Sequence, residues 1–527
     1  MDIDSEDTPT ERRPSHSSPN SSKLSDSPFA QTCSISPLNP NPSFQPIPPG
    51  RRPERKTRKW LPNFTARQWL IFGVFVGTNF LAGMVYNMKG PFYPQEAESK
   101  GVTPSQYGFV FGIFEFVKVF ASPLYGKYMN QLGTRKIFLG SLYIVAICSI
   151  LFGLLDEISD ATTFLVCSLA LRVVEAIGSS GYSCALFSII AHEFPGSVAT
   201  AFAVLEACFG VGLIIAPPLG GVLYQLAGYP LPFVTVGLLI FTVVNLICVI
   251  MPRNFTVRDG DGRATEGFGV FKILRVKGIT FAAVGVLTAA CSTGFVNATL
   301  EPHLRQFNLT PFQTGVVFST YGLVYAMTAP AWGWVCDRVR EPKYITLFGA
   351  GCNFIAFLLI GPAPLFKFDT ILWVTCVALI LHGLALAAIF VSLFILAFSF
   401  AVASGMPNDM KTHAVVSGMW TSLLSLGMFL GPSVGGILLD SVGFRWGSLF
   451  VICIMACLIV LVFTYLILQK CTIRSPINPD GITADPISTK ETAPLLLPTP
   501  LPTPDVEDND LQSQIRQSTS GTYGATV

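Results

Sequence analysis

Residues 416–436, VSGMWTSLLSLGMFLGPSVGG, decide the fold of this chain, because residues 201–221, AFAVLEACFGVGLIIAPPLGG, repeat their spacing of small residues and proline. Both copies lie inside long apolar segments. The matched positions are Ala203, Gly212, Ala216, Pro217, Gly220 and Gly221 in the first copy and Gly418, Gly427, Gly431, Pro432, Gly435 and Gly436 in the second. We infer that one helix has been used twice and that the chain is built from two related halves.

The composition indicates a protein whose solvent is lipid. Hydrophobic residues make up 51% of the 527 residues, charged residues 13%, and the mean hydropathy is +0.54, whereas soluble domains carry about 25% charged residues. A membrane-spanning helix needs about 20 mostly apolar residues. We therefore predict an all-α membrane protein of twelve transmembrane helices in two pseudo-symmetric six-helix halves, with helices beginning near Trp69, Tyr107, Ile137, Thr162, Val198, Phe233, Thr280, Gly315, Tyr344, Ile371, Thr412 and Trp446.

Polar tails flank the predicted helices, and a basic loop divides them. The tails are rich in Ser and Pro and lack apolar periodicity, which is typical of disorder. The predicted parts are a disordered tail over 1–66, a six-helix half over 67–252, an inter-half loop over 253–278, a second six-helix half over 279–470 and a disordered tail over 471–527. Basic residues precede the first span and follow the second, so the positive-inside rule places the loop and both termini in the cytosol.

Two loops carry a related motif. The candidate conformational residues are Gly126, Gly133 and Arg135 after the second predicted span and Gly333, Asp337 and Arg338 after the eighth. These loops resemble the G-x-x-x-D-R-x-G-R-R loop of the major facilitator superfamily, although Asn130 and Gln131 replace its charged pair in the first copy. The resemblance implies that the acidic residue caps a neighbouring helix and that Arg bridges helices in the outward-open state. Asp337 and Arg338 are thus the better candidates for an ionic latch.

The repeated helix resembles the antiporter signature of the same superfamily, G-x8-G-x3-G-P-x-x-G-G, which the second copy matches in full. Its first copy contributes Gly212, Pro217, Gly220 and Gly221, and its second contributes Gly427, Gly431, Pro432, Gly435 and Gly436. Small residues one turn apart allow close helix approach, and proline permits bending. The motif therefore implies antiport by resemblance, and a tight packing seam on physical grounds.

Arg172, Glu175 and Gly178 are similar to the R-x-x-Q-G-x-G motif that the superfamily associates with proton coupling, with Glu175 in place of Gln and Ala176 in place of the first Gly. With Pro91 and Pro94 they resemble the drug:proton antiporter branch and, within it, the vesicular amine transporter family. Residues 90–128 and 300–304 look most like the members of that family that carry polyamines. The resemblance implies exchange of luminal protons for a cationic amine.

Ionisable residues inside predicted spans are functional candidates, because each costs about 2.5–3.5 kcal/mol on insertion scales. Glu115 and Lys118 lie three residues apart, as do Arg172 and Glu175, so each pair either cancels locally or takes part in function. Glu206 has no basic residue nearby on its own helix. It either pairs with Arg172 or exchanges a proton for a cationic substrate, since a carboxylate in low dielectric can hold a proton near neutral pH.

Two further ionisable residues remain open to two interpretations. Glu301 lies near the predicted luminal end of the seventh span, beside His303, and is either a gate or entry charge or a solvated interfacial group. His382 lies near the repeat position of Arg172 and is either a coupling group or a hydrogen-bonded core histidine. The first span offers Asn79 and Asn87 but no Asp, whereas the monoamine members of the resembled family use an Asp there. Monoamine recognition in that mode is therefore not expected.

The C-terminal tail contains Glu491, Leu495 and Leu496 in the pattern of an acidic dileucine sorting signal. It predicts binding of a clathrin adaptor to the C-terminal tail and residence on secretory, endosomal or lysosomal vesicles. We hypothesise a proton-coupled antiporter that moves cationic amines, polyamines favoured, into acidic vesicles by alternating access. The alternatives are a plasma-membrane drug or organic-ion exporter and a non-transporting scaffold or sensor. No catalytic, nucleotide or metal motif is present, so we expect no enzyme, no cofactor and no nucleic-acid partner.

Overall fold

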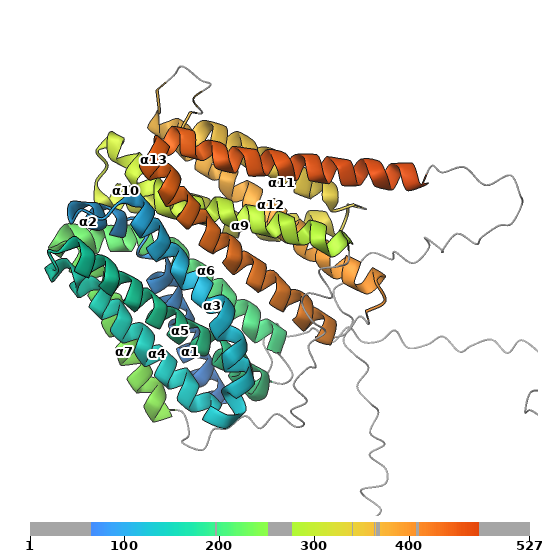
Figure 1. Ribbon diagram of the computed structural model, residues 1–527. Helices are drawn as coiled ribbons and strands as arrows, with labels where there is room; N and C mark the ends of the chain where they lie inside the picture. The colour runs from blue at the N-terminus through green and yellow to red at the C-terminus, as the bar shows by residue number, and fades with distance from the viewer. Residues whose placement is uncertain are drawn as a thin grey trace, which may run out of the picture. The chain divides into compact units, whose positions relative to one another are not determined.

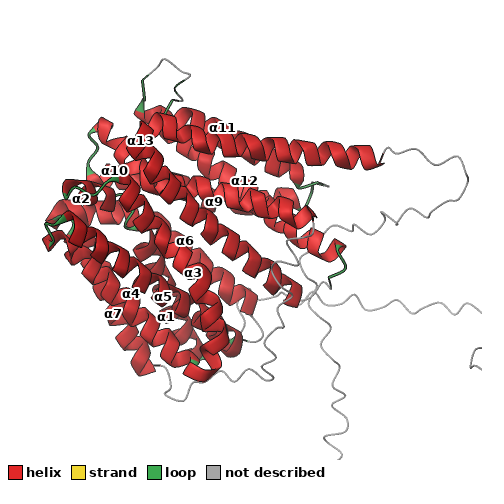
Figure 2. Cartoon of the chain, in the orientation of Figure 1, coloured by secondary structure: helices red, strands yellow, loops and turns green. Residues whose placement is uncertain are grey.

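Helices account for nearly all of the regular structure in the computed structural model (Figures 1 and 2). The structure describes residues 65–194, 198–250, 277–339, 341–362, 364, 369–406 and 410–473. These residues belong to a unit that spans residues 61–527. The sorting signal at Glu491, Leu495 and Leu496, most of the predicted inter-half loop and nearly all of both tails lie outside the described residues.

The helices of the amino-terminal part are α1 (Ala66–Asn87), α2 (Tyr93–Ser99), α3 (Pro104–Leu132), α4 (Thr134–Gly153), η1 (Leu154–Glu157), α5 (Ala161–Glu193), α6 (Val198–Ala227) and α7 (Pro230–Ile250). Those of the carboxyl-terminal part are α9 (Lys277–Leu304), η2 (Arg305–Phe307), α10 (Pro311–Cys336), α11 (Lys343–Ile360), α12 (Leu372–Ala403) and α13 (Met410–Ile473). α13 joins two helices across a kink at Gly443, whose φ of 76° suits glycine. We call the end of the helices at which α2, η1 and η2 lie the α2 end.

The starts of α3 and α10 show the repeat at the level of single hydrogen bonds. Each begins with Thr-Pro and a Gln three residues after the Thr, at Thr103 and Gln106 and at Thr310 and Gln313. The Gln side chain accepts from the Thr backbone N–H at 3.0 Å in α3 and at 2.9 Å in α10. This capping box satisfies N–H groups that a helix start leaves unpaired. The same local chemistry thus begins corresponding helices of the two parts.

The prediction of an all-helical membrane protein is confirmed. Each of the twelve predicted starts lies within four residues of an observed helix start or, for Trp446, of the Gly443 kink. In the described part of the chain, ten helices are long and apolar enough to cross a membrane. α10 is not among these ten, and α13 is counted as one of them over 54 residues. Twelve transmembrane helices therefore stay a prediction. The count requires that α10 also spans the membrane and that α13 is counted as two spans.

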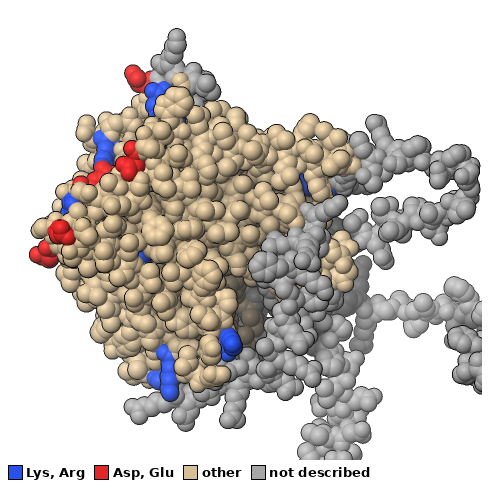
Figure 3. Space-filling model, in the orientation of Figure 1, with Lys and Arg blue, Asp and Glu red and all other residues tan. Residues whose placement is uncertain are grey.

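Two apolar cores organise the helices. One is formed by residues between Ile71 and Ile247, and the other by residues between Ile279 and Leu466. Lys, Arg, Asp and Glu gather toward the ends of the helices, and the flank seen in Figure 3 is nearly free of them. This distribution suits helices whose sides face lipid.

Glycines bring α6 against α1 and α13 against α9. A Cβ on Gly212 would lie 2.1 Å from the carbonyl oxygen of Phe80, and a Cβ on Gly83 would lie 2.2 Å from that of Phe209. In the other part, a Cβ on Gly431 would lie 2.3 Å from the carbonyl oxygen of Cys291. Backbone cannot approach this closely across any larger residue. The repeated motif therefore forms a packing seam in each part.

We predict that Gly212→Ala destabilises the protein by about 1–3 kcal/mol, the usual cost of overpacking, because the added methyl group meets backbone that has little room to move. Gly210→Ala is the matched control, since nothing lies within 4 Å of a Cβ at that position of the same helix. Thermal unfolding in detergent measures both. Equal melting temperatures for the two variants would contradict the seam.

Candidate functional site

A small cavity lies between the two parts of the chain. Its walls come from α1, α3 and α5 on one side and from α9 and α13 on the other. The lining residues are Tyr86, Asn87, Gly90, Phe111, Phe114, Glu115, Arg172, Gly294, Asn297, Met428 and Pro432. The surface is therefore partly aromatic, and Glu115 and Arg172 are its charged members.

Glu115 of α3 is the carboxylate of this cavity, and its residue is only 5% exposed. Its Oε1 accepts from the Tyr86 hydroxyl at 2.9 Å and from Lys118 Nζ at 3.2 Å. Its Oε2 accepts from the Ser425 hydroxyl of α13 at 2.7 Å. Because Tyr86 and Ser425 lie in different parts of the chain, the carboxylate connects the two. A proton or a cation on Glu115 would change that connection.

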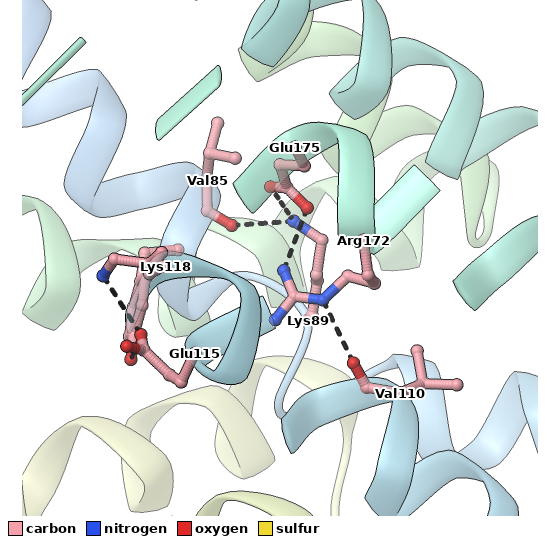
Figure 4. Close-up of polar contacts among 8 residues, drawn as sticks. Val85, Lys89, Val110, Glu115, Lys118, Arg172 and Glu175 are labelled. Carbon is pink, nitrogen blue, oxygen red and sulfur yellow. Dashed lines mark hydrogen bonds and ion pairs between the residues drawn. The ribbon is translucent and has the colours of Figure 1, made fainter. Parts of the chain in front are cut away.

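Arg172 and Glu175 of α5 form a second charged cluster with Lys89, which follows α1 (Figure 4). Glu175 receives Lys89 Nζ at 2.7 Å and Arg172 Nη1 at 2.9 Å, and all three residues are at most 4% exposed. Arg172 also stacks on Phe114, with Cζ 4.2 Å from the ring centroid. Two cations against one carboxylate leave an excess positive charge beside the cavity. Glu175 is thus held by two cations and does not line the cavity, whereas Glu115 does.

Glu206 of α6 is exposed, and the charge of Lys118 acts on it. Arg172, the partner considered for it from the sequence, is bound to Glu175 instead. Within the described residues, no ion pair of 4.0 Å or less involves Glu206. Its role stays a prediction.

His382 of α12 is fully buried in the carboxyl-terminal core, as the hydrogen-bonded interpretation requires. Its Nδ1 lies 2.7 Å from Oδ1 of Asn353, whose Nδ2 donates to the Ser292 hydroxyl at 3.1 Å. Tyr321 stands next to the imidazole and donates through its hydroxyl to Asn297, a cavity residue, at 2.8 Å. His382 therefore does not line the cavity itself, but contacts Tyr321, which binds a residue of the cavity wall.

Glu301 belongs to an ion-pair network at the α2 end. Arg305 donates to both oxygens of Glu301, at 2.7 and 2.6 Å, and also contacts Glu98 of α2. Ser105 and Asp440 make another contact between the two parts, at 2.6 Å. These links join segments more than 200 residues apart in the sequence. Glu301 is thus paired rather than free, and its function as a gate stays a prediction.

Backbone contacts reinforce this end. A Cβ on Gly221 would lie 2.4 Å from the carbonyl oxygen of Pro311, and one on Gly436 would lie 2.3 Å from that of Pro104. The last glycines of the two antiporter-type motifs therefore pack across the two parts, whereas Gly212 and Gly431 pack within them. Each motif therefore packs against a helix of its own part and also against a helix of the other part.

The predicted conformational loops contact their own part of the chain in this structure. Arg135 Nη2 donates to the carbonyl oxygen of Cys248, at the end of α7, at 3.0 Å. Arg338, two residues after the end of α10, stacks on Trp334 of that helix, with Cζ 3.6 Å from the ring centroid. Gly126, Gly133 and Gly333 have open space where a Cβ would stand, and Gly133 has a φ of +85°. A switching role for these residues stays a prediction.

The pairing of Lys89 with Glu175 and of Ser425 with Glu115 was not predicted from the sequence. The available signal for Lys89 was a charged residue at the end of an apolar span, two residues before Pro91. Ser425 gave no such signal, because serine is common in membrane helices.

Comparison with known proteins decides the family. A model of the Major Facilitator Superfamily matches residues 75–406 and, in a second match, residues 282–499. The chain belongs to this superfamily. The MFS-type transporter SLC18B1 of Mus musculus is 30% identical over 405 residues, covering 76% of this chain and 86% of the relative. The Homo sapiens protein of the same name is 32% identical over 372 residues, covering 69% and 79%.

Other relatives agree with this membership. The chromaffin granule amine transporter of Homo sapiens is 21% identical over 357 residues, covering 65% of this chain and 62% of the relative. A bacterial homologue of the human lysosomal transporter Spinster, solved in an inward-facing and occupied conformation, has a TM-score of 0.61 at 14% identity and covers 79% of this chain and 100% of its own. This likeness shows the fold alone. The resemblance inferred from the motifs is confirmed, and the chain is a multi-pass membrane transporter rather than an enzyme.

Proposed function

We propose that this transporter exchanges protons for a cationic amine, with polyamines as the favoured substrates. The observation that carries the proposal is Glu115, a buried carboxylate in the inter-part cavity that accepts hydrogen bonds from Tyr86 and from Ser425. An ammonium group fits a carboxylate flanked by aromatic faces, through charge, hydrogen bonds and cation–π attraction. Tyr86 and Phe114 supply such faces beside Glu115.

Exchange follows if Glu115 holds either a proton or an ammonium group. Beside Lys118, a proton-bound Glu115 and a Glu115 that binds one ammonium group give the site the same net charge, so both forms of the carrier can cross with an equal charge. Rocking of the two halves about the cavity would then expose the site to each side in turn. In this structure the halves contact each other at the α2 end, through Glu98 with Arg305 and through glycine packing.

Polyamines are favoured over monoamines for two reasons. The first helix lacks an Asp, and its Asn79 is already engaged by the Tyr182 hydroxyl. Glu206 on α6 provides a second, exposed carboxylate toward which a further ammonium of a long substrate can extend. Transport into an acidic vesicle suits this chemistry, since the proton gradient then drives amine accumulation. The predicted dileucine signal, the cytosolic termini and adaptor binding belong to the same proposal.

Uptake into proteoliposomes tests the proposal. The unmodified chain is reconstituted with an acidic interior, and uptake of labelled spermidine is compared with that of labelled serotonin, with and without a proton ionophore. We expect gradient-dependent spermidine uptake that exceeds serotonin uptake and that the ionophore removes. Spermidine uptake that is the same with and without the ionophore would refute proton coupling. Uptake of serotonin but not of spermidine would refute the polyamine assignment.

A further inference from the structure

The carboxylate that we assign to the substrate is already occupied by an ammonium group of the protein. Lys118 Nζ lies 3.2 Å from Glu115 Oε1, 5.2 Å from the ring centroid of Phe114 and 5.7 Å from that of Tyr86. Glu115, Phe114 and Tyr86 all line the cavity. We call these three residues the ammonium box. The end of the Lys118 side chain, an alkyl stem with a primary ammonium, has the chemistry of one end of a polyamine.

Lys118 is held more loosely than Lys89, the lysine of the neighbouring charged cluster. Its side chain is 25% exposed, whereas that of Lys89 is 2% exposed and lies 2.7 Å from Glu175. Lys118 also has a second carboxylate within electrostatic reach, because its charge acts on Glu206 of α6. A four-carbon stem can move between such positions without a change in the backbone. Partial exposure and a flexible stem therefore allow Lys118 to leave the box.

We propose that Lys118 is a tethered occupant of the ammonium box, which a primary ammonium of the substrate displaces toward Glu206. This inference rests on the proposed function, since it assigns the box to an amine. It has a consequence for specificity: the substrate must donate an N–H to Glu115 as Lys118 does, so primary amines compete and quaternary ammonium ions do not. Competition with Lys118 also lowers the affinity of the box for substrate. The side chain acts as a short tether that keeps the Lys118 ammonium at an effective concentration of about millimolar.

Removal of the tethered cation tests the proposal. In Lys118→Ala we expect the KM for putrescine uptake to fall about tenfold or more, because the competing ammonium is gone. We also expect n-butylammonium, which reproduces the missing side chain, to bind purified Lys118→Ala at least about tenfold more tightly than the unmodified protein, and tetramethylammonium to bind neither. Lys127→Ala is the matched control, since Lys127 is an exposed cation on the same helix, beside Tyr128.

A substitution at Glu206 provides a second test of the proposal. If displaced Lys118 pairs with Glu206, Glu206→Gln weakens n-butylammonium binding in the unmodified background and has no further effect in Lys118→Ala, because this monoamine has no second ammonium for Glu206. Equal n-butylammonium affinity in the unmodified protein and in a monodisperse Lys118→Ala variant would overturn the proposal. An unfolded Lys118→Ala would be replaced by Lys118→Met, which keeps the stem and removes the charge. Because binding is measured without transport, absence of spermidine uptake by the unmodified chain would refute the proposed function separately.

Discussion

Glu115→Gln is expected to reduce gradient-driven amine uptake, expressed as kcat/KM, by at least about thirtyfold. Loss of one partner of a buried, hydrogen-bonded charge pair costs about 2–5 kcal/mol, and about 1.4 kcal/mol corresponds to a factor of ten. Gln can still accept a hydrogen bond from one of the two hydroxyls, of Tyr86 and Ser425, through its oxygen and donate to the other through its NH2 group, so the fold is retained. It can neither bind a proton nor neutralise an ammonium group. Uptake of labelled spermidine by proteoliposomes measures the effect.

Two further variants help to interpret the result for Glu115→Gln. Glu157→Gln removes an exposed carboxylate of η1 and should leave uptake unchanged. Glu115→Asp keeps the charge on a shorter stem and should retain part of the activity, with a higher KM. Glu115→Gln that transports at the unmodified rate would exclude this carboxylate as the shared site of proton and amine.

Glu175→Gln is expected to cost about 3–5 kcal/mol of stability. It leaves Lys89 and Arg172 as neighbouring buried cations, and breaking a buried ion pair from one side has a cost of this order. Thermal unfolding in detergent measures the loss. Glu193→Gln is the control, because its partner Arg67 is 58% exposed at 3.5 Å and exposed pairs contribute less than about 1 kcal/mol.

A charge-balanced double variant separates electrostatics from packing. Lys89→Met with Glu175→Gln restores the single net positive charge of the cluster, with Arg172 left as its cation. We expect this double variant to be more stable than Glu175→Gln alone. Equal melting temperatures for the double variant and for Glu175→Gln alone would show that the cluster stabilises the protein through packing rather than through charge.

Local features could be predicted from the sequence, because they depend on the geometry of a single helix. Glu115 with Lys118 and Arg172 with Glu175 are three residues apart, and both pairs form. The helix starts were predictable for the same reason, since apolar length and capping chemistry are local.

Contacts that depend on how helices pack could not be predicted in this way. Lys89 reaches Glu175 across 86 residues of sequence, and Ser425 reaches Glu115 across 310. The double role of the repeated glycines is of this kind too, since their spacing is the same whether Gly212 faces α1 or Gly221 faces α10. Packing alone therefore reveals that Glu115 connects the two parts of the chain.

Proton release from acid-loaded proteoliposomes on addition of spermidine tests the central claim most directly. A pH indicator enclosed in the vesicles reports the interior while labelled spermidine enters. The account predicts alkalinisation of the interior in step with uptake, and its loss in Glu115→Gln. Spermidine uptake with no change of interior pH, or alkalinisation that is unaltered in Glu115→Gln, would contradict exchange of protons for amines at this carboxylate.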